Sequence, residues 1–395
     1  MNVSMKIKDI IKLYNEKNFY EALNSINSFL ESNTQNNQAY NLKGVILRAL
    51  GRSNEALLSY DMGISINPND HLLYNNKANV LRDLKKFNEA EECYKQSLKI
   101  DNNYYKTLCN LSELYIEVDD YEKSEYYSKK SILINDMYPE AYRVLGVAQK
   151  KLKKKNKSIK NFKKYLEFNP HSSTVIHQID LLEGNTPETS PVEFIKDVFD
   201  SYAYRFEEHL MNDLNYAGPK AIKDLIKNNF YKNKAFTNIL DLGCGTGLNG
   251  FFLKTLCKNL IGIDLSENML RIAKEKSIYD RLIKDDFINV LEKEEISYDL
   301  FVASDVFIYT GKLEKIFELI NLRSSKESWF IFTTENQKNG TYNLQDTGRY
   351  THSINYIKSL CEKNNFKINF YEDFDLRLQN KQWVKGNIFL VKILN

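Results

Sequence analysis

The chain has 395 residues, which exceeds what one ordinary hydrophobic core accommodates and predicts at least two domains. A hydrophobic content of 43% fits a globular protein, while the lack of an 18-residue apolar run argues against a membrane-spanning helix. The net charge of +3 neither requires nor excludes an acidic partner. Residues 1–12 lack the apolar stretch of a secretory signal, and the cysteines show no C-x-x-C spacing. We therefore expect a cytoplasmic protein with reduced thiols and no metal site.

The first 172 residues repeat with a period of 34. Small side chains recur at this interval at Ala22, Ala56, Ala90, Ser124 and Ser158, and again at Gly44, Ala78, Ser112 and Gly146. Mostly large side chains follow the first set by four positions, as at Tyr60, Tyr94 and Phe162. Small residues let paired helices cross closely, and large ones fill the space between pairs. This pattern is typical of tetratricopeptide (TPR) repeats and predicts an all-α solenoid of five units, 3–36, 37–70, 71–104, 105–138 and 139–172.

Residues 173–191 follow the repeats. Their first part is apolar and predicts a capping helix for the last repeat, and their second part carries Gly184, Pro187 and Pro191 among polar residues, which predicts a linker. The expected domains are thus a TPR array at 1–172, a capping helix and linker at 173–191, and a second domain at 192–395. A solenoid offers a concave groove, so we expect a protein or peptide partner there, with self-association as the alternative.

A lysine-rich segment, 150–164, carries nine lysines in fifteen residues. Its apolar positions keep helical spacing, and no aromatic platform for bases is interleaved, so we favour a solvated helix face over a nucleic-acid patch. Residues 191–395 hold 28 basic and 28 acidic side chains. This balance argues against a nucleic-acid substrate held through its phosphates.

The second domain alternates strand and helix patterns. Candidate strands are 238–242, 260–264, 281–284, 300–304, 329–334, 367–371 and 387–393. Amphipathic segments separate the first five, which predicts a doubly wound, Rossmann-like parallel sheet. The last two have no room for a crossover helix between them and should pair antiparallel at one edge.

The most informative motif lies after the first of these strands. Glycines at Gly243, Gly245 and Gly247 form a G-x-G-x-G turn, and Asp264 ends the next strand. Glycines let the backbone pass close under a ligand, and an acid at this place can accept from a ribose diol. The dinucleotide fingerprint would place a glycine at Leu248 instead. The pattern resembles motif I of class I S-adenosylmethionine-dependent methyltransferases.

That resemblance implies a cofactor, S-adenosyl-L-methionine, and roles for several residues. Asp264 would hold the ribose, Asp286 the adenine amino group (Asp285 is the alternative), and Asp305 the ammonium of the methionine part. The cofactor-binding residues it implies are Asp241, Gly243, Cys244, Gly245, Gly247, Asp264, Leu265, Met269, Asp286, Phe287, Asp305 and Tyr202. A helix over 193–210 could cover the cofactor, with Tyr202 against the sulfonium, or could be ordinary packing.

Two further segments narrow the resemblance. Residues 199–203 read Phe-Asp-Ser-Tyr-Ala, and 348–353 read Gly-Arg-Tyr-Thr-His-Ser. With repeats ahead of the domain, they resemble bacterial TPR-repeat methyltransferases, whose catalytic domain is similar to ubiquinone-pathway and malonyl-carrier O-methyltransferases. Arg349, Tyr350 and His352 would then lie at the mouth of the site. His352 is a candidate general base or a loop-stabilising histidine, and Arg349 or Arg377 could pair with an acceptor carboxylate.

The sequence therefore predicts a methyltransferase acting on an acceptor oxygen or nitrogen, with TPR repeats that recruit a partner or the substrate. A TPR adaptor with a non-catalytic second domain is the alternative. A third hypothesis is a carrier-protein methyltransferase whose acidic carrier binds the lysine-rich segment.

Overall fold

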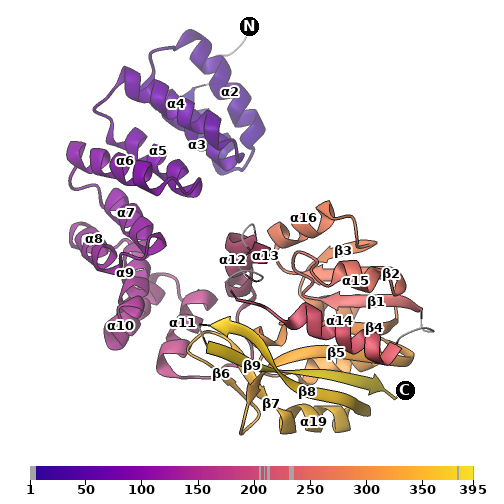
Figure 1. The fold of residues 1–395 in the computed structure, drawn as a ribbon. Coiled ribbons are helices and arrows are strands. Elements are labelled where there is room, and N and C mark those ends of the chain that lie inside the picture. Colours follow the sequence, from indigo (N-terminus) through magenta and orange to yellow (C-terminus); the bar gives the residue numbers. More distant parts are fainter. Residues whose placement is uncertain are drawn as a thin grey trace. The chain divides into compact units, whose positions relative to one another are not determined.

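The computed structural model describes residues 6–203, 206–208, 210, 214–230, 235–379 and 382–394, except for the side chains of Ser201 and Tyr202. The chain divides into two compact units, Met1–Ser172 and Ser173–Asn395. Figure 1 shows the first unit in indigo to magenta and the second mainly in orange and yellow.

The first unit consists of helices in antiparallel pairs, one pair for each expected repeat. They are α1 (Ile7–Asn15), α2 (Phe19–Ser32), α3 (Asn37–Ala49), α4 (Ser53–Ile66), α5 (His71–Asp83), α6 (Phe87–Ile100), α7 (Tyr105–Glu117), α8 (Tyr121–Ile134), α9 (Pro139–Lys151) and α10 (Lys155–Phe168). The expectation of a helical repeat array is confirmed.

Small residues sit where the helices of a pair cross. A Cβ on Gly44 would lie 2.5 Å from the ring of Tyr60, and one on Gly146 would lie 2.6 Å from the ring of Phe162. These distances are shorter than any van der Waals contact, so Tyr60 and Phe162, at this crossing, leave no room for a side chain on Gly44 or Gly146. The 34-residue spacing of the sequence is therefore a packing requirement.

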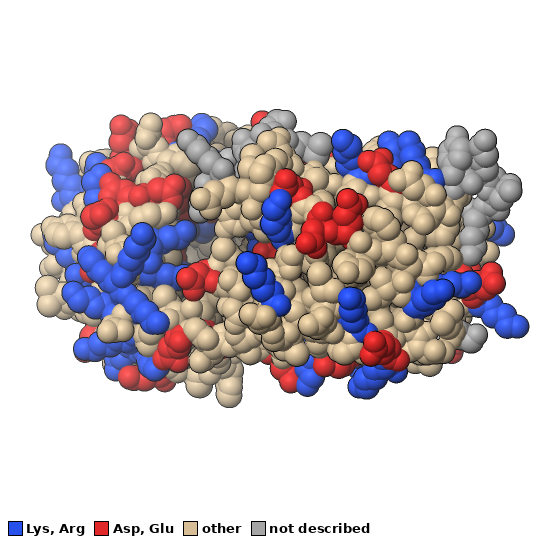
Figure 2. All heavy atoms as spheres, turned by 60° about the horizontal axis from the view of Figure 1, so that its bottom comes forward, with Lys and Arg blue, Asp and Glu red and all other residues tan. Residues whose placement is uncertain are grey.

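The lysine-rich segment spans the end of α9 and most of α10. Two of its lysines are already paired within the repeats, Lys154 with Glu125 and Lys164 with Glu167. Figure 2 shows basic and acidic side chains side by side over the visible face, with the basic ones most dense toward the left.

The second unit begins with helices that precede its sheet. They are α11 (Ser173–Glu183), α12 (Val192–Tyr202), α13 (Phe206–Glu208) and α14 (Gly218–Phe230). Within this unit Leu181 of α11 packs with Leu344 and Tyr350. The segment expected as cap and linker is thus part of the second compact unit, and its capping role stays a prediction.

A twisted sheet forms the centre of the second unit. Its strands are β1 (Phe236–Leu242), β2 (Cys257–Asp264), β3 (Arg281–Lys284), β4 (Tyr298–Ala303), β5 (Ser324–Gln337), β6 (Tyr342–Leu344), β7 (Tyr350–Ser353), β8 (Phe366–Gln379) and β9 (Gln382–Ile393). The strand order is β3-β2-β1-β4-β5-β7-β6, and β9 pairs with β5 and β8. β1 to β5 are parallel, and β9 is antiparallel to both its neighbours. This confirms the doubly wound sheet with a late antiparallel strand.

The count of seven strands was wrong for the described residues, because the connection after β5 adds β6 and β7. β7 continues the sheet beside the end of β5, with Glu335 opposite Thr351. β6 then pairs antiparallel with β7. These strands have three and four residues, too few for a period-2 pattern to stand out in the sequence.

Helices cover both faces of the sheet (Figure 1), namely α14 and, after the first strand, α15 (Gly250–Lys254), α16 (Glu267–Glu275), α17 (Phe287–Lys293), α18 (Glu314–Leu322) and α19 (Ile354–Lys363). Alternate strand residues enter two cores: Leu240 and Phe301 belong to one, Ile239 and Leu300 to the other. Parallel strands covered on both faces end at one common edge, where loops gather. No helix within the described ranges is long and apolar enough to cross a membrane.

Candidate functional site

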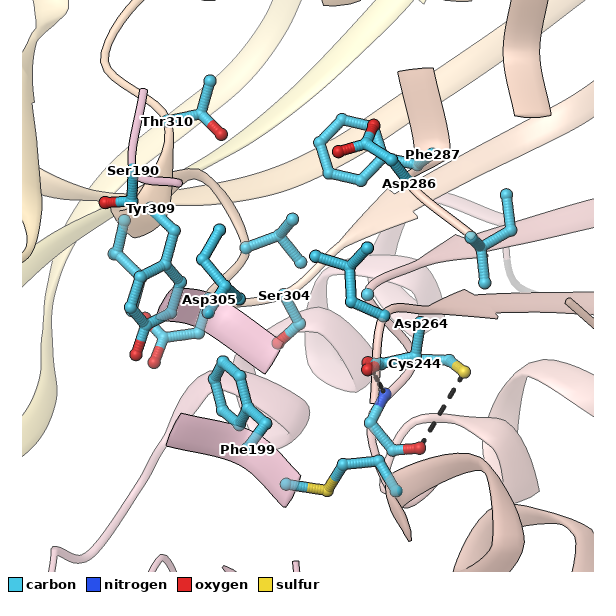
Figure 3. Close-up of a pocket in the computed structure, with 18 of the residues that line it drawn as sticks. Ser190, Phe199, Cys244, Asp264, Asp286, Phe287, Ser304, Asp305, Tyr309 and Thr310 are labelled. Atoms are coloured by element: carbon cyan, nitrogen blue, oxygen red, sulfur yellow. Dashed lines mark hydrogen bonds between the residues drawn. The ribbon is translucent and has the colours of Figure 1, made fainter. Parts of the chain in front are cut away.

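A cavity of about 870 Å³ opens at the carboxyl ends of the first four strands. Its walls come from the turn after β1, from the loops after β2, β3 and β4, and from residues 188–199 ahead of and within α12. Figure 3 shows Ser190, Tyr309 and Phe199 on the left and Asp286, Phe287, Asp264 and Cys244 on the right, with Ser304 between them. The cavity is therefore at the strand edge that the sequence indicated.

The glycine turn forms the floor of the cavity. Gly243 and Gly245 line it and have φ of 61° and 54°, which side-chain-bearing residues rarely adopt. A Cβ on Gly243 would lie 2.5 Å from Cγ2 of Val306. Gly247, with φ of 84°, is not among the lining residues and packs against Tyr279 instead. Its need for glycine thus comes from the turn itself.

Asp264 closes the adjoining edge. Its Oδ2 accepts from the Gly245 N–H at 2.9 Å and its Oδ1 from the Ser266 N–H at 2.8 Å. Burial raises the pKa of Asp264 to about 6. Leu265 and Met269 line the cavity beside it, as does Cys244, whose thiol pKa burial raises. The carboxylate is fixed by the glycine turn and faces the cavity.

Asp241 lies beneath the glycine turn and helps to hold it. It is 1% exposed, is absent from the lining, and its Oδ2 accepts from the Tyr279 hydroxyl at 2.7 Å. Burial raises the pKa of Asp241 to about 7. A Cβ on Gly262 would meet the Tyr279 ring at 2.9 Å, so this tyrosine fills the space beneath the turn. Direct cofactor contact by Asp241 is not what this geometry favours.

Three residues after β3 line the far end of the cavity. Asp286 caps α17, because its carboxylate accepts from the Ile288 N–H at 2.7 Å, and burial raises its pKa. Asp285 accepts from the Asp286 N–H and from Asn289, and the amide of Asn289 lowers the pKa of Asp285. Both acids and Phe287 line the cavity, so the choice between Asp286 and Asp285 stays open.

Asp305 follows β4 in a strained conformation. Its φ is 59°, and its N–H donates to Thr333 Oγ1 at 2.9 Å. Its carboxylate accepts from Nη1 of Arg377, which also pairs with Glu335. Arg377 is 1% exposed. Three strands thus contribute to one buried charge cluster of net charge −1 at the wall of the cavity.

Arg349 lines the cavity and donates to Gln379 Oε1 at 3.5 Å, and its positive charge acts on the Tyr309 hydroxyl. Burial raises the pKa of Tyr309. The ring of Phe199 packs edge-on against Tyr309, with centroids 5.4 Å apart. This end of the cavity therefore combines aromatic walls with a cation.

His352 and Tyr350 lie behind the wall and are not among the lining residues, contrary to the expectation that they sit at the mouth. Nε2 of the fully buried His352 lies 3.0 Å from the carbonyl oxygens of Thr310 and Gly311, and burial lowers its pKa to about 4. The Tyr350 hydroxyl donates to Pro187 O at 2.9 Å. Both residues hold loop backbone, so the loop-stabilising alternative for His352 fits the geometry and the general base does not.

Tyr202 ends α12, but its side chain lies outside the described residues. Phe199 of the same helix reaches the cavity. Sequence reasoning missed Tyr279, Tyr309 and Glu335 as parts of the site. Only Glu335 carried a usable signal, since it is an acid near the carboxyl end of the fifth strand.

Comparison with known proteins agrees with this geometry. Residues 239–321 match the methyltransferase domain family. Residues 38–70, 71–104 and 139–172 match tetratricopeptide repeat families, within a residue of three of the five expected units. The chain thus joins TPR repeats to a methyltransferase domain.

Two curated relatives are methyltransferases as well. An uncharacterised methyltransferase of Schizosaccharomyces pombe is 35% identical over 92 residues, which are 21% of this chain and 32% of that protein. A probable S-adenosylmethionine-dependent methyltransferase of Saccharomyces cerevisiae, CRG1, is 31% identical over 101 residues, 24% of this chain and 34% of that protein. The chain therefore spans about a third of these curated relatives. The expected cofactor, S-adenosylmethionine, agrees with these matches.

Among solved structures, magnesium protoporphyrin IX methyltransferase (ChlM) from Synechocystis PCC 6803 with bound SAM is 15% identical. The likeness covers 51% of this chain and 96% of that one, with a TM-score of 0.40.

Proposed function

We propose that this protein is a cytoplasmic S-adenosylmethionine-dependent methyltransferase that methylates an oxygen or nitrogen of its acceptor, and that its TPR repeats recruit a protein partner or the substrate. The observation that carries the proposal is the position of Asp264. Its carboxylate is held at 2.9 Å from the N–H of Gly245 in a cavity that Gly243 and Asp305 also line.

The cavity fits the cofactor in size and chemistry. Its volume of about 870 Å³ leaves room for a nucleoside and an acceptor together. Asp264 would accept from the ribose hydroxyls, while Asp286 or Asp285, with Phe287, would hold the adenine. Gly243 and Gly245 would pass beneath the methionine part of the cofactor. A side chain at Gly243 would overlap Val306, so glycine is required there. When bound, S-adenosylmethionine supplies an electrophilic methyl group on a sulfonium.

The chain's own residues would then orient the two reactants and exclude water. Phe199 and Tyr309 form an apolar wall beside the place where the cofactor and the acceptor would meet. Asp305, fixed by Arg377, would hold the cofactor ammonium. Proximity and alignment supply much of the rate of such a displacement, so a residue acting as general base is not required. An environment with few waters also favours a step in which positive charge is dispersed.

The repeats support a recruiting role. A five-unit array has no chemistry of its own and presents a groove suited to a peptide or partner helix. Pairing of Lys154 with Glu125 and of Lys164 with Glu167 within the repeats gives little support to a nucleic-acid partner.

Calorimetric titration of the full-length protein with S-adenosylmethionine and S-adenosylhomocysteine tests the cofactor site. We expect dissociation constants on the order of micromolar for both. Asp264→Ala should weaken binding at least tenfold without lowering the melting temperature much. Glu267→Ala is the matched control, because this exposed acid lies three residues away and pairs only with Lys284 among the described residues. Absence of binding to the folded wild-type protein would leave the TPR adaptor as the better account.

A further inference from the structure

Of the residues that the structure describes, two arginines line the cavity, and their surroundings differ. Arg377 is 1% exposed and is neutralised by Asp305 and Glu335. Arg349 is partly exposed, and its recorded partners, Gln379 and Tyr309, are neutral groups. Among the described residues no carboxylate lies within ion-pair distance of Arg349. Glu335 and Arg349 influence each other electrostatically, but within the described part of the chain the Arg349 guanidinium has no ion-pair partner, so an incoming anion could pair with it.

Arg349 also lies outside the part of the cavity that the nucleoside is expected to fill. The glycine turn, Asp264 and Asp286 follow β1, β2 and β3, whereas Arg349 directly precedes β7. Glu335 of β5 has Gly386 of β9 on one side and Thr351 of β7 on the other, whereas β4 pairs with β5 only as far as Phe332. β7 therefore lies beyond the carboxyl end of β4, next to residues 307–309. A nucleoside over β1 to β3 leaves this part of the cavity for the second substrate.

The wall around Arg349 is aromatic and apolar. The charge of Arg349 acts on the Tyr309 hydroxyl, and Phe199, Ile195 and Ser190 also line the cavity. In Figure 3 Phe199, Tyr309 and Ser190 lie together, across the cavity from Asp286. A guanidinium with an adjacent hydroxyl offers three or more donors to one carboxylate, and the rings offer contact to an apolar body.

We infer that Arg349 is the specificity-determining residue for the acceptor, and that the acceptor is an apolar molecule or tethered group that carries a carboxylate. The inference rests on the proposed function, because it needs a cofactor in the β1–β3 part of the cavity. Arg349 anchors the carboxylate, with the Tyr309 hydroxyl as a second donor, and the aromatic walls take the apolar part. Arg377 has no share in this recognition, since both its carboxylate partners come from the protein itself.

The test uses full-length protein saturated with S-adenosylhomocysteine and matched pairs of probes: benzoate with benzamide and octanoate with octanamide. Calorimetry should show at least one carboxylate binding ten- to a hundredfold more tightly than its amide, as expected for one charge-assisted contact. Arg349→Gln should remove this preference, and Arg349→Lys should keep part of it. Arg281→Gln is the matched control, because Arg281 is an exposed arginine of β3 that pairs with Glu294.

Three results would overturn the inference. None of the probes binds the loaded protein; or acid and amide bind equally; or Arg349→Gln weakens S-adenosylhomocysteine itself tenfold, which would assign Arg349 to the cofactor's own carboxylate. Wild-type protein that fails to bind S-adenosylhomocysteine is a different outcome, because it removes the proposed function first and the inference with it.

Discussion

Nη1 of Arg377 donates to both carboxylate oxygens of Asp305, at 3.0 and 3.1 Å. Arg377 lies on β8, and Asp305, 72 positions earlier, lies in the loop that follows β4. Asp305 has a left-handed backbone, whose cost for a side-chain-bearing residue is about 1–2 kcal/mol. The ion pair helps to hold this conformation, and Glu335 on the other side of the guanidinium leaves the cluster with one net negative charge. That charge suits the ammonium we assign to Asp305.

Arg377→Met should therefore weaken the binding of the cofactor's amino-acid part more than the binding of its nucleoside part. Affinity for S-adenosylhomocysteine should fall more than tenfold, whereas methylthioadenosine, which lacks the amino-acid part, should lose less than threefold. Calorimetry with the two ligands measures the difference. The variant also leaves buried carboxylates without their cation, at a cost of about 3–5 kcal/mol in unfolding free energy. Arg377→Met combined with Glu335→Gln limits that cost, and equal loss for both ligands in this double variant would contradict a role in positioning Asp305.

Gly243→Ala should prevent cofactor binding. The added Cβ meets Val306 at 2.5 Å in a backbone with φ of 61°, so strain and overlap together should cost about 2–5 kcal/mol of stability. Gly340→Ala is the control, since φ there is 78° but the nearest atom is a flexible glutamine amide at 3.4 Å. Its expected cost is about 1–2 kcal/mol with unchanged affinity. Denaturant unfolding and calorimetry check both, and tight binding by the Gly243 variant would remove the turn from the site.

Much of the fold is local in the sequence, and that part could be predicted. The 34-residue period reflects helix crossings such as Gly44 on Tyr60, which returns as Gly146 on Phe162 three units later. The alternation of strands and helices follows from apolar runs that fill two cores. β6 and β7 were missed because such short strands exist only through their pairing with each other and with β5.

The site likewise has a part that is local in the sequence and a part that is assembled from distant segments. The glycine turn and Asp264 belong to one strand–turn–helix–strand unit, so their spacing was informative. The cluster of Asp305, Glu335 and Arg377 joins three distant segments, and no spacing links them. His352 was expected at the mouth of the site, as a general base or a loop-stabilising residue, and the fold turns its ring onto the backbone of residues 310 and 311.

Cofactor affinity should depend on pH through Asp264. Burial raises its pKa to about 6, and ribose hydroxyls donate to the ionised form, so affinity for S-adenosylhomocysteine should fall as the pH drops from 7 to 5. The stability of the free protein depends on pH with the opposite sign. The contribution of Asp264 to the free energy of unfolding decreases as the pH rises toward 6, because burial penalises the charged form. Asp241, with a pKa of about 7, titrates in the same range, and Asp200 also acts on Asp264.

Calorimetry across this range with Asp264→Asn separates these groups. The amide variant should bind more weakly at pH 7 and should lose most of the slope. A slope as steep as that of the wild type would assign the dependence to Asp241 instead.

His352 should matter for stability and hardly at all for cofactor binding. Its Nε2–H donates to the carbonyls of Thr310 and Gly311, and Nδ1 is buried without a recorded partner, so the neutral ring is the folded form. Burial lowers the pKa to about 4 from an ordinary value of 6.5. The folded state therefore binds fewer protons than the unfolded state between these values, and stability present above pH 6.5 is lost as the pH falls toward 4. The loss attributable to this residue is at most about 3 kcal/mol.

His352→Gln should reduce this acid sensitivity and lower the melting temperature at pH 7.5, since an amide only partly replaces the two carbonyl contacts. Its affinity for S-adenosylhomocysteine should stay within twofold of wild type. His71→Gln, a half-buried histidine of the repeats, is the matched control and should leave the acid sensitivity of the second unit unchanged. Unchanged stability in the His352 variant, together with loss of methyl transfer to an identified acceptor, would restore the general base that this geometry argues against.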